Sequence, residues 1–189
     1  TSIVESSDRI RREDLLRAFT VNLLGPVASS QQAYGYMKKQ GGGHIINVGT
    51  PGFMIGVPFY ASYACSKAAF SAWTRTIQGE WADAGIVVSE YFPGYTETGA
   101  VAESAYGPIP MDLVMNRDKG FLARYFSGAR NGDDIARDLV NLAKKPRPLM
   151  FSTFMERVAG FVANIASIRV PVVKRMAATA RKKMEVKHV

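Results

Sequence analysis

The sequence predicts an α/β domain built on a parallel sheet. Helical and strand-like patterns alternate along the chain, and strands that are joined by a helix usually pair in parallel. The strand-like runs are short and mostly apolar, which is typical of strands that are covered on both faces. The chain has 189 residues, of which 47% are hydrophobic and 21% charged, and this is the size and balance of one globular domain.

A long helix over 11–40 is the first predicted element, because apolar residues recur there at helical spacing. Pro26 lies within it and leaves the carbonyl of Asn22 without its usual amide partner, so we expect a bend near 22–25. The remaining elements follow in chain order: a strand over 44–48, a helix over 61–84, a strand over 86–92, a helix over 133–145 and a third strand over 148–152.

The carboxyl-terminal part is predicted to be helical and basic. Residues 154–168 and 172–185 have helical patterns, and Pro171 is expected to divide them. The last 21 residues hold seven Lys or Arg against one acid, which accounts for most of the net charge of +8. The expected organisation is a domain over 1–152 and a helical, basic extension over 153–189.

Composition and charge exclude several classes of protein. A charge excess that is confined to the tail does not make a basic face across the domain, so we expect no nucleic acid partner. One cysteine and two histidines cannot fill a tetrahedral zinc site or form an internal disulfide, so we expect no metal and a reducing, cytoplasmic compartment. Cations after an apolar helix are typical of an interfacial anchor, so peripheral membrane contact through 153–189 stays open beside a helix packed on the domain.

Tyr63 and Lys67 are the clearest candidates for chemistry. They are four residues apart on a predicted helix and therefore share a face. A phenol has a pKa of about 10, and a nearby ammonium in a cleft of low dielectric lowers it, which makes a usable general acid or base. Thr50 follows a strand, at the edge where open α/β sheets bind ligands. A Tyr-x-x-x-Lys pair alone also occurs on ordinary helix surfaces, so the surroundings decide its meaning.

Five blocks of sequence occur in the order and spacing of a known family: 21–25, 43–48, 63–69, 80–81 with 85–88, and 93–98. Over about 15–98 the chain resembles the short-chain dehydrogenases/reductases. The resemblance implies a doubly wound parallel sheet of the Rossmann type and a nicotinamide cofactor, NAD or NADP. The glycine-rich G-x-x-x-G-x-G turn of that family does not occur in these 189 residues, so they are expected to be the carboxyl-terminal portion of such a fold and inactive alone.

The resemblance also implies a role for each site residue. Tyr63 would exchange the proton with the substrate oxygen, and Lys67 would lower the pKa of Tyr63 and hold the nicotinamide ribose. Thr50, where the family usually has serine, would orient the substrate carbonyl, and the main-chain carbonyl of Asn22 would hold a water in the proton relay. The implied cofactor contacts are Asn47, Val48, Gly49, Tyr63, Lys67, Pro93, Gly94, Thr96 and Thr98, of which the last four match the turn that meets the nicotinamide carboxamide in that family.

The predicted function is an NAD(P)-dependent oxidoreductase that interconverts a secondary alcohol and a ketone. The segment 96–131 corresponds to the family's substrate lid, and its apolar residues favour a small hydrophobic alcohol or ketone as the substrate. A homo-oligomer through helices 11–40 and 60–84 is expected. Two alternatives stay open: a non-catalytic binding or scaffold protein that keeps the fold, and a peripheral membrane-binding protein that acts through its basic tail. The presence of both Tyr63 and Lys67 disfavours the non-catalytic alternative.

Overall fold

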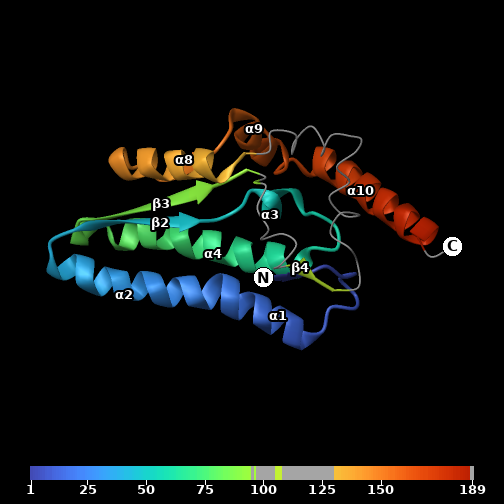
Figure 1. Ribbon diagram of the computed structural model, residues 1–189, viewed down its shortest axis with the longest axis horizontal. Helices are drawn as coiled ribbons and strands as arrows, with labels where there is room; N and C mark the ends of the chain where they lie inside the picture. Colours follow the sequence, from blue (N-terminus) through green and yellow to red (C-terminus); the bar gives the residue numbers. More distant parts are fainter. Residues whose placement is uncertain (95, 97–104, 108–129, 188–189) are drawn as a thin grey trace.

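The computed structural model describes residues 1–94, 96, 105–107 and 130–187. Its central elements are the strands β2 (Gly43–Val48), β3 (Ile86–Phe92) and β5 (Leu149–Phe151) and the helices α2 (Gly25–Lys39), α4 (Ala61–Glu80) and α8 (Gly132–Lys144). The strands pair in parallel in the order β2-β3-β5. Helices α2 and α4 lie on one face of this sheet and α8 lies on the other (Figure 1). The predicted α/β class with a parallel sheet is thus confirmed.

Both faces of β3 are covered, as its apolar sequence predicts. Successive side chains of a strand point to opposite faces of the sheet. On one face, Val88 packs with Ile45 of β2 and Ile77 of α4 in the main hydrophobic cluster. On the other face, the Tyr91 hydroxyl donates a hydrogen bond to Asp138 of α8 at 2.8 Å. The sheet is therefore the middle layer of three, and its carboxyl edge is the place where a ligand site is expected.

The amino-terminal helix is interrupted near the position that Pro26 predicts. Between α1 (Arg12–Phe19) and α2 lies η1 (Thr20–Leu24), a turn of π-helix. Pro26 has no N–H for the usual bond to the carbonyl four residues back, and the π-turn closes instead with a bond across five residues. Such turns are frequent at functional sites, and this one lies at Asn22, which is buried.

Two glycines let the central strands begin side by side. Gly85 has a φ of +71°, which a side chain would strain, and it links the short 3₁₀ turn η2 (Ala82–Ala84) to β3. A Cβ on Gly42 would lie 2.8 Å from the Gly85 carbonyl oxygen. The helix predicted over 61–84 thus ends as an α-helix at Glu80 and tightens before the strand.

A second, two-stranded parallel sheet pairs β1 (Ser2–Ile3) with β4 (Ala105–Tyr106). Strand β4 belongs to the predicted lid 96–131, most of which lies outside the described residues. The two ends of that segment meet, because Thr96 and Arg130 pair in an isolated parallel bridge.

The carboxyl-terminal helices are α9 (Phe154–Val162) and α10 (Ala166–Lys187), and the predicted division at Pro171 is wrong. The break lies at 163–165, where the Asn164 side chain donates to the carbonyl of Gly160 at 2.8 Å and satisfies the end of α9. Pro171 lies inside α10, which continues through it.

The extension contacts the rest of the protein. Helix α9 packs on β5 and on α3 (Gly52–Ile55), and Met176 of α10 packs against Val4 and Val57. The domain boundary between 152 and 153 stays a prediction. Among the helices of the described residues, none is both long enough and apolar enough to cross a membrane.

Candidate active site

Thr50 and Tyr63 come together at the carboxyl end of β2. The Thr50 hydroxyl accepts a hydrogen bond from the Gly52 N–H at 3.2 Å, and this contact fixes the side chain in the loop after the strand. The Thr50 side chain also interacts with the Tyr63 phenol of the first turn of α4, and this interaction lowers the pKa of Tyr63. The strand end and the helix start thus place the two predicted hydroxyls near one another.

Tyr63 has a raised pKa, which differs from the expectation that Lys67 lowers it. Burial is the main cause, the neighbouring Tyr60 adds to it, and the interaction with Thr50 opposes it, which together raise the pKa of Tyr63 to about 12. The Tyr60 and Tyr63 ring centroids are 4.7 Å apart, and the Ser2 hydroxyl donates to the Tyr60 oxygen at 3.1 Å. The phenol of Tyr63 is therefore protonated at neutral pH in this structure and is a proton donor.

The Lys67 side chain points to the end of β2 and makes no resolved contribution to the Tyr63 pKa. Its Nζ donates to the Val48 carbonyl oxygen at 3.3 Å and lies 5.8 Å from the centroid of the Phe70 ring. Burial lowers the pKa of Lys67. The ammonium is held at the carboxyl edge of the sheet, next to the loop that carries Thr50.

Asn22 connects the π-turn to the helix that carries Tyr63 and Lys67. Its Nδ2 donates to the Ser66 hydroxyl at 3.0 Å and to the Thr1 carbonyl at 2.7 Å. The Ser66 hydroxyl in turn donates to the Tyr63 carbonyl at 2.8 Å. The Asn22 side chain is thus used in packing the two helices together, and the water-binding role of its main-chain carbonyl stays a prediction.

Three cofactor contacts are predicted at the end of β2. In this structure Asn47 and Gly49 serve the packing of the fold, and Val48 binds Lys67. The Asn47 side chain is buried, where it donates to Thr74 at 3.0 Å and accepts from Ser30 at 3.5 Å, so its amide serves the core. The Val48 carbonyl oxygen accepts a hydrogen bond from the Lys67 ammonium. A Cβ on Gly49 would lie 2.5 Å from the Phe92 ring, so only glycine lets the chain pass there.

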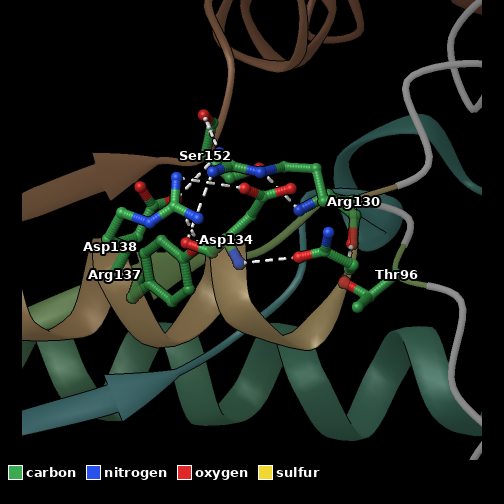
Figure 2. A network of polar contacts seen from close by, with 9 residues as sticks. Thr96, Arg130, Asp134, Arg137, Asp138 and Ser152 are labelled. Atoms are coloured by element: carbon green, nitrogen blue, oxygen red, sulfur yellow. Dashed lines mark hydrogen bonds and ion pairs between the residues drawn. The ribbon is translucent and has the colours of Figure 1, made fainter.

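The turn after β3 is held in place by its neighbours (Figure 2). The Gly94 N–H donates to the Ser152 hydroxyl at 2.8 Å, and the Thr96 hydroxyl donates to the Gly94 carbonyl at 3.1 Å. Pro93 begins this turn, and Thr98 lies outside the described residues. The other predicted contacts, on β2 and α4, are at the same edge of the sheet, because β2 and β3 are parallel neighbours.

Glu90 is a buried carboxylate that the sequence analysis missed. It is 2% exposed, and its Oε2 lies 3.4 Å from the Nε of Arg75. Burial raises the pKa of Glu90, and Ser71 and Arg75 partly oppose this. The signal was present in the sequence, since Glu90 interrupts an otherwise apolar strand pattern between Val88 and Phe92.

The ionisation of Glu90 is expected to lower the free energy of unfolding of the wild type as the pH rises. Glu90→Gln is expected to abolish this contribution to the pH dependence. Because the folded-state pKa of Glu90 lies above its ordinary value of 4.5, folding disfavours the ionised form. The stabilisation of the fold by protonated Glu90 is fully present below pH 4.5 and is lost as the pH rises through the folded-state pKa of Glu90. Urea unfolding of the complete protein at several pH values measures this loss. The exposed Glu80→Gln is the control and should keep the wild-type slope, and an unchanged slope in Glu90→Gln would contradict the assignment.

Fold and site together define a doubly wound α/β protein of the Rossmann type, with polar side chains at the carboxyl edge of its parallel sheet. A sequence profile described as short chain dehydrogenase matches residues 2–107. The chain belongs to this family, as the five sequence blocks predict.

Individual relatives agree with this assignment. A Thermotoga maritima protein described as an uncharacterized oxidoreductase is 39% identical over 103 residues, which are 54% of this chain and 41% of that protein. A short-chain dehydrogenase from Streptomyces avermitilis has a similar structure, with a TM-score of 0.69, 16% identity and coverage of 96% of this chain and 68% of that one. The angucycline C-6 ketoreductase LanV with bound NADP has a TM-score of 0.63 and 20% identity, over 80% of this chain and 57% of that one. The chain thus spans less than half of the Thermotoga relative's length.

Proposed function

We propose that the protein is an oxidoreductase that interconverts a secondary alcohol and a ketone with NAD or NADP. The observation that carries the proposal is the placement of Thr50 near Tyr63, one helical turn from Lys67, at the carboxyl edge of the sheet. The Lys67 ammonium also has the hydrogen-bond donors that the ribose of a nicotinamide cofactor requires. An ammonium has three N–H donors, and among the described residues Lys67 has one hydrogen-bond acceptor, so donors remain for ribose hydroxyls.

In the direction of reduction, the Thr50 and Tyr63 hydroxyls hold the substrate oxygen from one side. The raised pKa keeps Tyr63 protonated, so its phenol gives a proton to that oxygen as the alcohol forms. Lys67, one helical turn away, would stabilise the phenolate that is left, although in this structure it does not lower the pKa of Tyr63. The nicotinamide, when bound, supplies the hydride. In the reverse direction Tyr63 accepts the proton, and Thr50 again orients the oxygen.

The test is turnover of the complete protein with NADH and NADPH, each offered with a panel of apolar and polar ketones. We expect oxidation of at least one reduced cofactor that depends on the ketone. Binding of the cofactor without turnover on any ketone would favour the non-catalytic scaffold alternative. The 189 residues alone are expected to be inactive, since they contain no glycine-rich turn.

We also propose that the substrate is hydrophobic. A cavity of about 630 Å³ is lined by residues of α3, β5 and α9, and its lining is mainly apolar. Met54 of α3 lies four residues after Thr50 and faces this cavity together with Phe151, Phe154, Val158 and Phe161. The apolar residues of the 96–131 segment, which prompted this expectation, lie mostly outside the described residues.

A homo-oligomer through helices 11–40 and 60–84 stays part of the proposal. Leu16, Val21 and Leu24 are 52–56% exposed on the first of these helices, and Tyr36 is 72% exposed. The second helix exposes small side chains such as Cys65 and Ala72, which allow close approach of another helix. Such an apolar, unpartnered surface is typical of an interface.

Helices α9 and α10 expose an apolar and basic surface that favours peripheral membrane contact as a second role. Phe154 and Phe161 are 75% and 76% exposed. Near an anionic lipid surface each Lys or Arg contributes about 1 kcal/mol. The exposed cations are Arg157, Arg169, Lys174, Arg175, Arg181 and Lys182. A cytoplasmic compartment with membrane association is the location proposed.

Replacement of four cations of α10 is expected to release the complete protein from anionic vesicles. Wild type should co-sediment with anionic vesicles and less at high salt, because salt screens these charges. The glutamine variant covers Lys174, Arg175, Arg181 and Lys182, and the matched control covers Lys38, Lys39, Lys144 and Lys145. Equal pelleting of both variants, or no pelleting of wild type, would count against membrane contact and favour a helix packed on the domain.

A further inference from the structure

A largely enclosed ion pair lies directly beside the turn that follows β3 (Figure 2). The Nη1 atom of Arg130 is 2.9 Å from Oδ2 of Asp138, and the two side chains are only 20% and 14% exposed. The Tyr91 hydroxyl donates to the same carboxylate oxygen at 2.8 Å. The pair therefore joins the chain just before α8 to the middle of that helix, and Tyr91 connects it to the end of β3.

The same guanidinium also reaches the chain at the end of β5. Its Nη1 donates to the Ser152 carbonyl at 2.6 Å, and its Nη2 donates to the Asp134 carbonyl at 3.4 Å. Ser152 in turn receives the Gly94 N–H on its hydroxyl. The backbone of Arg130 pairs with Thr96, whose hydroxyl donates to Gly94. These contacts link Gly94, Thr96, Arg130 and Ser152 in a closed circuit.

The contacts of Arg130 indicate that it acts on the turn and not on a ligand directly. Its donors are used by a carboxylate and by backbone carbonyls, and its side chain is mostly removed from solvent. A guanidinium is planar and fixed in direction, so several bonds made at once fix the groups that accept them. Loss of one partner of such an enclosed pair leaves the other charge uncompensated, which moves the neighbouring chain.

We propose that Arg130, with Asp138, is a positioning residue that holds Gly94 and Thr96 where the chain after β3 meets the nicotinamide end of the cofactor. The inference rests on the proposed function, because the turn has this role only if NAD or NADP binds. Of the two ends of the cofactor, only the nicotinamide end is expected to depend on Arg130. The nicotinamide end should lose its contacts when Arg130 is replaced, whereas the adenosine end should not.

The test compares two ligands in the complete protein with Arg130→Met. The reduced cofactor carries the nicotinamide, and the ADP-ribose fragment that matches it does not. We expect the Kd of the reduced cofactor to rise about tenfold and the Kd of the fragment to stay within about twofold. Arg137→Met is the matched control, because Arg137 pairs with Asp134 at 3.5 Å on the same helix but is 70% exposed, and it should change neither Kd.

Two further variants keep the test decisive if Arg130→Met does not fold. Ser152→Ala removes the acceptor of the Gly94 N–H, and it should weaken binding of the reduced cofactor selectively but less than Arg130→Met. Arg130→Lys should recover part of the loss. Equal weakening of both ligands would show a general structural role and overturn the proposal, as would unchanged binding of both. If wild type binds neither ligand, the proposed function itself fails, and the inference falls with it.

Discussion

Replacing Tyr63 with phenylalanine is expected to lower kcat of the complete protein by about 10³-fold while the Kd of the reduced cofactor stays near that of wild type. The change deletes the hydroxyl that gives the proton and keeps the ring that packs beside Tyr60 at 4.7 Å. Because Tyr63 is half-buried beside Thr50, the change removes the proposed proton donor and leaves the packing of the site in place. Steady-state turnover and cofactor titration measure the two quantities separately.

Tyr60→Phe is the matched control for this experiment. Tyr60 is an enclosed tyrosine three residues away whose hydroxyl accepts from Ser2, so its loss tests the effect of removing a phenol without removing the proton donor. We expect its kcat to stay within a few-fold of wild type. A Tyr63→Phe enzyme with wild-type turnover, or a Tyr60→Phe enzyme with an equal loss, would contradict the assignment of the proton donor.

Lys67→Met is expected to damage both turnover and cofactor binding, by about 10²-fold in kcat/KM. The ammonium reaches the Val48 carbonyl at 3.3 Å, so it links α4 to the strand end and faces the site proposed for the ribose. Its loss removes a positive charge that stabilises the phenolate and a donor to the cofactor. Lys39→Met, at the exposed end of α2, is the control and should change neither quantity. If Lys67→Met lowered kcat and left cofactor binding unchanged, the proposed contact between Lys67 and the ribose would be wrong.

Periodicity and turn chemistry predicted much of the fold. The alternation of helical and strand-like runs placed β2, β3 and β5 to within a residue or two and implied their parallel pairing. Pro26 predicted the interruption of the first helix because a missing N–H is a local property of the sequence. Pro171 has the same property, yet α10 continues through it, since packing of Met176 against Val4 and Val57 outweighs one lost hydrogen bond.

The residues of the candidate site could be predicted from the sequence, but the pKa of Tyr63 and the direction of the Lys67 side chain could not. The spacing of Tyr63 and Lys67 predicted a shared helix face, which is correct, and a lowered pKa of Tyr63, which this structure does not have. The direction of the Lys67 ammonium depends on where the Val48 carbonyl ends up, and that requires the folded strand. Long-range pairs such as Tyr91 with Asp138 leave no spacing signal, because their partners are 47 residues apart.

The most direct test of the central claim is deuterium transfer from a reduced cofactor labelled at C4 of its nicotinamide to the product alcohol. The account predicts that the complete protein, given a ketone that it reduces, places the deuterium on the carbinol carbon, and that Tyr63→Phe makes almost none of this product. Product without deuterium from either labelled face of the nicotinamide, or full labelling by Tyr63→Phe, would contradict a hydride-transfer site built around Thr50, Tyr63 and Lys67.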